Sequence, residues 1–125
     1  MNKESVFLNF KWSVQALGIP ADKQIKAFPE FVIVTDELLL EFANWKEVVV
    51  GNFKNELTER QIYLLQKLHN QMANFPEFNI ETSDFEILNT SRFFDELRTM
   101  AQQVLLEFNW NLEDPPFDRV NYIKA

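Results

Sequence analysis

Apolar residues recur every three or four positions through most of the chain, which is the period expected of amphipathic helices. The pattern predicts four long and two short helices, over residues 4–17, 20–27, 36–56, 59–75, 84–89 and 91–109. No linker or low-complexity segment divides the chain, so residues 1–125 are expected to form a single helical domain. We therefore predict an all-α fold, in which about four main helices pack as a bundle or irregular array with short extended links.

An α+β fold is the alternative interpretation. Apolar residues occupy every second position of residues 6–14, as in a half-buried strand, and the run FVIV at Phe31–Val34 could form another strand. Gly18 and Pro20 favour a helix over the first segment, because Gly can adopt the left-handed conformation at a helix end and Pro then stops the helix. Val48–Val50 and Gly51 are poor helix formers, so a kink or an early stop near Gly51 is the alternative to a continuous third helix.

Capping patterns locate three helix starts. Thr58 and Gln61 have the spacing of a capping box, in which each side chain bonds the other residue's backbone N–H. Ser83 and Glu86 have the same spacing. Thr35 is the predicted N-cap of the third helix, with acidic residues following it in the first turn.

A hexapeptide occurs twice with one substitution, as FPEFVI at residues 28–33 and FPEFNI at residues 75–80. Pro stops a helix and pushes the preceding residue into an extended conformation. The favoured interpretation is a junction that ends one helix, anchors an extended link through its aromatic residues and restarts the next. An ancient duplication and a ligand motif used twice are the alternatives.

Composition excludes several kinds of site. The chain has 125 residues, 46% of them hydrophobic, with 13 Phe, 3 Trp, no Cys and only two Gly. The absence of Cys removes disulfides, thiolate nucleophiles and Cys-ligated zinc, and the two glycines form no phosphate-binding loop. We see no signal peptide and no apolar run long enough to span a membrane, so we expect a cytoplasmic protein.

The net charge of −7 bears on the partner. Residues 63–125 carry ten acidic and five basic side chains, so most of the excess lies in the C-terminal half. Acidic surfaces repel phosphate backbones, which disfavours nucleic acid, whereas they attract a basic protein and speed encounter with it. Alternatively, the charge only keeps a Phe-rich protein soluble.

No residue pattern indicates catalysis or metal binding. His69, the only histidine, lies on the apolar face of its helix and is expected to be a partly buried, hydrogen-bonded core residue. Glu37 and Glu41 are four residues apart, but the chain has no Glu-x-x-His motif for a di-metal site. The acids of the tail lack the glycine-containing loop of a calcium site. We therefore predict no catalytic, cofactor or metal site.

The candidate site is an acidic protein-binding surface. Acidic residues gather at the short fifth helix, the start of the last helix and the tail, which would form one patch if these regions meet. Trp110 would be its apolar anchor, since aromatic residues within a charged rim are typical of protein interfaces. The predicted partner-binding residues are Asp84, Glu86, Asp95, Glu96, Trp110, Glu113, Asp114 and Asp118. The alternative is a solvated face whose aromatic residues turn inward and form part of the core.

The small, acidic, cysteine-free helical chain resembles bacterial immunity proteins of polymorphic toxin and contact-dependent inhibition systems, also in WNLEDPPFD at Trp110–Asp118. The resemblance implies a tight complex with a basic toxin domain, often a nuclease, whose cationic active site is covered without any reaction. A second hypothesis is a small enzyme or ligand carrier with an inter-helix pocket lined by Trp12, Trp45 and His69. A self-associating structural subunit is a third.

Overall fold

The computed structural model describes residues 2–79 and 81–116. It contains six α-helices and no strand among these residues, which confirms the all-α prediction. The bounds are α1 Lys3–Gly18, α2 Ala21–Lys26, α3 Val34–Phe53, α4 Glu59–Met72, α5 Asp84–Thr90 and α6 Arg92–Glu107, with a single 3-10 turn at Lys54–Glu56. Neither segment that the α+β alternative predicts as a strand forms one. Residues 6–14 are helical, residues 31–33 form an irregular link, and Val34 begins α3.

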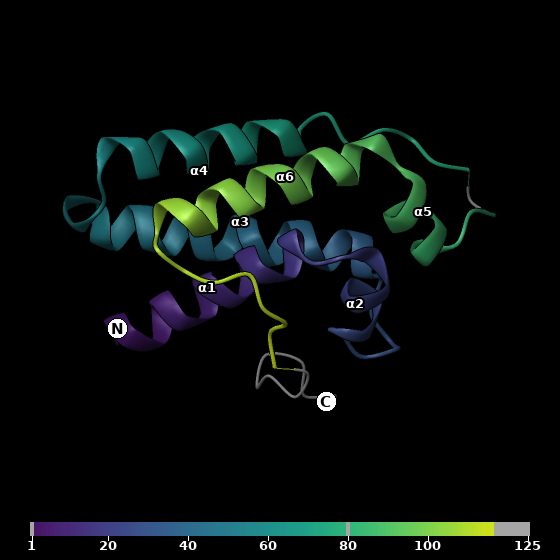
Figure 1. Ribbon diagram of the computed structural model, residues 1–125, viewed down its shortest axis with the longest axis horizontal. Coiled ribbons are helices and arrows are strands. Elements are labelled where there is room, and N and C mark those ends of the chain that lie inside the picture. Colours follow the sequence, from purple (N-terminus) through teal and green to yellow (C-terminus); the bar gives the residue numbers. More distant parts are fainter. Residues whose placement is uncertain (1, 80, 117–125) are drawn as a thin grey trace.

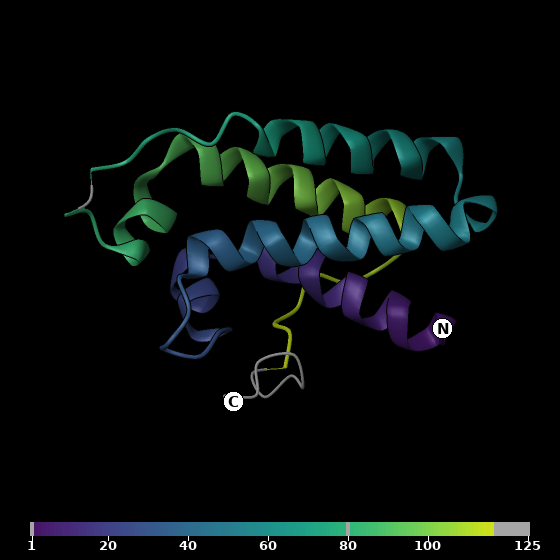
Figure 2. The same cartoon turned by 180° about the vertical axis from the view of Figure 1, so that it is seen from behind.

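The four long helices α1, α3, α4 and α6 form the body, as predicted (Figures 1 and 2). Helix α6 packs against both α1 and α4, and α1 also packs against α3. The short helices α2 and α5 contact each other and lie together at one end of the body. Residues 28–33 and 75–79 of the two repeated hexapeptides lie between helices at this same end, as the junction interpretation predicts, although the first link is a turn and not an extended segment.

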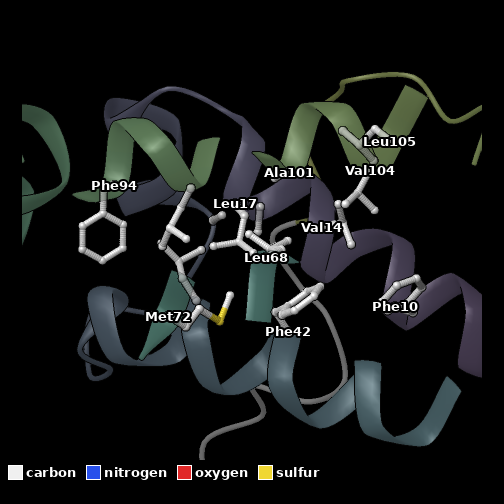
Figure 3. Close-up of a cluster of buried hydrophobic side chains, with 14 of the residues drawn as sticks. Phe10, Val14, Leu17, Phe42, Leu68, Met72, Phe94, Ala101, Val104 and Leu105 are labelled. Carbon is white, nitrogen blue, oxygen red and sulfur yellow. The ribbon is translucent and has the colours of Figure 1, made fainter. Parts of the chain in front are cut away.

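The core lies where the apolar faces of the long helices meet (Figure 3). Phe10, Phe42 and Phe94, from α1, α3 and α6, are fully buried, and Leu65 and Leu68 of α4 join them. Removing a side chain of this size from water contributes roughly 1.5–3 kcal/mol. Helical spacing of these residues in the sequence is therefore what places the four helices around one core.

Helix α1 ends without the left-handed glycine that its sequence predicts. Gly18 is the last helical residue and its φ is negative. The terminal carbonyls of α1 are instead bonded by the buried amide of Gln24, which donates to Ala16 O and Leu17 O at 3.0 and 3.1 Å. A glycine still suits this position, because a Cβ there would lie 3.1 Å from Leu112 Cδ1. The hydrogen bonds from Gln24 of α2 thus take the place of the glycine cap that the sequence predicts at the end of α1.

The end of α6 turns the tail back onto the body. Asn109 adopts a positive φ of 59°, and Trp110 N donates to Leu105 O at 2.9 Å, which is the Schellman arrangement. Trp110 then stacks on Phe108, with ring centroids 4.7 Å apart, and meets Phe10 edge-on. Of the described tail, Trp110 is partly buried and Pro115 is buried, whereas residues 111–114 and 116 are exposed.

The local caps are confirmed in part. Thr58 and Gln61 form the complete capping box of α4. Ser83 Oγ accepts from Glu86 N at 3.1 Å, but the reciprocal bond is not among the described contacts. Helix α4 ends at Met72, before the predicted end at residue 75, and α3 continues through Gly51 to Phe53.

Candidate functional site

The two repeated links meet at a cleft of about 640 Å³ at the end of the body that carries α5. The first link contributes Ile33, and the second contributes residues 75–79. The start of α3 and one face of α5 complete the walls through Thr35, Asp36, Asp84 and Ile87. We call this hollow the acidic cleft. Residues of both repeated links therefore line one site, whereas the favoured sequence interpretation gave the repeat a structural role as a junction.

Asp84 determines how the cleft is built. Its carboxylate accepts hydrogen bonds from Val34 N at 2.6 Å and Thr35 N at 3.1 Å, so a residue of α5 caps the start of α3. The N-cap position is occupied by Ile33, which makes no side-chain cap. The prediction of Thr35 as N-cap is therefore wrong, because a carboxylate from elsewhere in the chain satisfies these N–H groups and lets α3 begin at Val34.

The second link is held against the core by its first aromatic residue. Phe75 meets Phe93 and Phe94 of α6 edge-on, with centroid distances of 5.3 and 6.1 Å, and also meets Phe78 at 5.5 Å. Asn79 closes the link in a turn, accepting from Glu81 N through its side chain at 2.9 Å. These contacts fix this wall of the cleft against α6.

Apolar side chains stand exposed around the cleft. Nine large hydrophobic side chains are exposed among the described residues, and four of them, Phe31, Ile33, Phe75 and Phe85, belong to the two links and α5. Ile33 is 61% exposed. A concentration of exposed apolar groups within a charged surface is typical of a protein-binding site.

The acids of this region lack counter-charges. Residues 28–45 and 68–91 contain eight acidic side chains and no Lys or Arg. All six ion pairs between described side chains lie outside these two stretches. Six of the eight carboxylates form no ion pair or hydrogen bond with a described residue: Glu30, Asp36, Glu37, Glu77, Glu81 and Glu86. Their negative charge is available to a partner.

A shallow groove of about 290 Å³ continues this surface along α3. It is lined by Glu37, Leu40, Glu41, Asn44 and Trp45, with Leu40 61% exposed. Leu40 lies one turn beyond Asp36 of the cleft, so the two hollows share a helix face. Partial burial, with the neighbouring carboxylates of Glu41 and Asp36, raises the pKa of Glu37 above its ordinary value.

The predicted partner-binding residues do not form one unpaired patch. Glu86 is exposed beside the cleft, whereas the carboxylate of Asp84 is already bonded to α3. Asp95 pairs with Arg98 at 2.6 Å, and Glu96 accepts from Gln71 and Arg92.

The remaining predicted residues belong to the tail. Glu113 and Asp114 lie 3.8 and 3.4 Å from Lys11 and Lys23, so each acid has a cation beside it. Trp110 is half-buried on Phe108 and Phe10. Asp118 lies outside the described residues.

The apolar and acidic residues that line the cleft are not among the predicted partner-binding residues, apart from Asp84. Asp36, Glu77 and Ile33 were read as parts of a helix start and of two junctions. The signal that could have found them is the distribution of bases: both hexapeptides lie in stretches that carry acids and no Lys or Arg. Reading the charge by halves of the chain concealed this pattern.

The three residues that the carrier hypothesis places around one pocket, Trp12, Trp45 and His69, do not line the groove on α3 together. Trp45 lines that groove and donates to Glu41 at 2.9 Å, whereas Trp12 and His69 do not line it. His69 is partly buried as predicted, but its Nδ1 has no hydrogen-bond partner among the described residues. Among the described residues, no three His, Cys, Asp or Glu side chains are placed to hold a metal ion. No helix formed by these residues is long and apolar enough to cross a membrane.

Comparison of the chain with models of protein families, with curated proteins and with solved structures found no match.

Proposed function

We propose that this protein is a protein-binding module that neutralises a basic toxin domain, in the manner of the bacterial immunity proteins that its sequence resembles. The protein performs no reaction in this proposal. It acts by covering the partner's active site, so that substrate cannot enter. A nuclease is a fitting partner, because a surface that holds nucleic acid is itself cationic.

The observation that carries the proposal is the unpaired acidic charge around an apolar cleft. Carboxylates crowded without counter-ions repel one another and disfavour the free domain. A basic partner relieves that repulsion, while Ile33 and Phe75 supply apolar area that the partner can cover. Charge of this kind speeds encounter and selects the partner, and the buried apolar contact slows dissociation.

A solubilising role alone accounts less well for the arrangement. Charges that only maintain solubility can be interspersed with opposite charges over the whole surface. Among the described residues the six ion pairs lie outside residues 28–45 and 68–91, and the six unpaired acids of these two stretches lie near four exposed apolar side chains of the links and α5. Exposed apolar residues do not aid solubility.

The test uses the C-terminal domain of an exported protein encoded beside this chain. Titration calorimetry at low and high salt should give a tight one-to-one complex that weakens as salt rises, because exposed charges are screened. Co-expression of this chain should restore growth to cells that express the domain. Absence of binding, or binding without protection, would overturn the assignment for that partner.

A further inference from the structure

We infer that the acidic cleft receives a projecting segment of the partner that carries an apolar side chain between Lys or Arg residues. This inference rests on the proposed function and deepens it by naming the kind of element that is recognised. It follows from the shape of the cleft, from its apolar lining and from the sign of its charge.

Shape indicates a projecting element. The cleft has a volume of about 640 Å³ and is walled by two links, the start of α3 and one face of α5. Hollows of this size hold a small ligand or a few side chains. A projecting loop or helix end contacts more of the lining of such an open hollow than a flat surface does, so we infer that the recognised element projects from the partner.

The apolar part of the occupant follows from Ile33. This residue occupies the N-cap of α3, a position where Ser, Thr, Asp or Asn would bond a backbone N–H and where Ile is among the least favourable residues. Its side chain is 61% exposed and lines the cleft, so core packing does not explain its presence. An exposed apolar residue that breaks a local rule in a cleft indicates a binding contact.

The cationic part of the occupant follows from Asp84. The start of a helix ordinarily attracts anions through its free N–H groups. Here the Asp84 carboxylate already accepts from Val34 N and Thr35 N, so this attraction is satisfied within the chain. Asp36 and Glu77 then give the cleft a net negative charge, which selects cations and repels phosphate or acidic segments.

The groove on α3 indicates the direction in which the partner's segment continues from the acidic cleft. Asp36 in the cleft and Asn44 at the far side of the groove are eight residues apart on α3, or about 12 Å along the helix axis. A segment anchored in the cleft can therefore continue along α3 and place a second basic residue against Glu37 and Glu41. The recognition element is then short and continuous in the partner's sequence.

The experiment is a selection from a phage-displayed library of random peptides on the intact protein. Two variants with the same change in net charge accompany it. The cleft variant carries Asp36→Lys and Glu77→Lys, and the distal variant carries Glu59→Lys and Glu107→Lys at the other end of the body. Each pair includes one acid from the first turn of a long helix, and circular dichroism confirms that both variants fold.

We expect the enriched peptides to carry an apolar residue flanked by Lys or Arg. Fluorescence anisotropy of a synthetic enriched peptide should show affinity for the distal variant close to that of the unmodified protein, and a loss of about tenfold or more for the cleft variant. Failure to enrich such peptides, or equal losses in the two variants, would overturn the inference. Calorimetry with the folded partner domain tests the proposed function separately. If the folded domain binds and no peptide does, the inference is wrong but the proposed function stands.

Discussion

The carboxylate of Asp84 lies 2.6 Å from the backbone nitrogen of Val34 and thereby joins the start of α5 to the start of α3. Fifty residues separate the two in the sequence. The same contact sets one wall of the acidic cleft and neutralises the anion-attracting end of α3. Asp84 therefore contributes both to the packing of α5 against α3 and to the wall of the candidate site.

Asp84→Ala should lower the free energy of unfolding by about 2 kcal/mol, because two backbone N–H groups of α3 lose a charged acceptor. Urea denaturation monitored by circular dichroism measures the change. Glu86→Ala is the matched control, since Glu86 lies in the same first turn of α5 but its carboxylate forms no hydrogen bond or ion pair with a described residue. Equal losses in the two variants would show that the contact with α3 contributes nothing.

Gly51→Ala should raise the free energy of unfolding by about 0.5–1 kcal/mol. Gly51 lies inside α3 with a negative φ, and a Cβ at this position would meet no atom within 4 Å. Gly18→Ala should give a smaller gain or a loss, because its Cβ would press against Leu112. Urea denaturation of both variants checks the contrast, and a destabilised Gly51→Ala would contradict the open space described beside Gly51 in α3.

Ile33→Ser should separate stability from binding. The introduced hydroxyl can cap Asp36 N, and so raise the free energy of unfolding by about 0.5–1 kcal/mol, while the apolar contact with the partner is lost. Ile33→Ala is the control, since it removes the apolar side chain without adding a cap. Both variants should bind more weakly, and only Ile33→Ser should be more stable. Unchanged binding in both would remove Ile33 from the site.

The raised pKa of Glu37 leads us to expect that the free energy of unfolding depends on pH. Its pKa is raised in the folded protein, chiefly by burial and then by Glu41 and Asp36, so the folded state binds its proton more tightly than the unfolded state does. Ionisation of Glu37 therefore costs stability as pH rises from its ordinary pKa of 4.5 through the raised value. Glu37→Gln should stabilise the protein at neutral pH, and this gain should vanish as pH falls below 4.5. A gain independent of pH would contradict this account.

Local patterns predicted most of the fold, because helical spacing and the box formed by Thr58 and Gln61 involve neighbours in the chain. Features set by distant residues were missed. The sequence around Val34 gives no sign that Asp84 will cap α3, and nothing near Gly18 shows that Gln24 will bond the end of α1.

The candidate site was predicted only in part, for the same reason. Acids at the start of α6 and in the tail looked available in sequence, but the fold brings Arg98, Lys11 and Lys23 beside them. Glu30 and Glu77, the acids of the two repeated links, form no ion pair with any residue that the structure describes. Whether an acidic side chain is unpaired depends on where every Lys and Arg lies in the folded chain. Local sequence patterns do not give these positions.

The central claim is that partner binding uses the acidic cleft. Calorimetric titration of the partner domain into the unmodified protein, the cleft variant and the distal variant tests it most directly. We predict a loss of affinity of about a hundredfold or more in the cleft variant and little change in the distal variant. Equal affinities for the cleft variant and the unmodified protein would show that the partner binds elsewhere, and would contradict the claim.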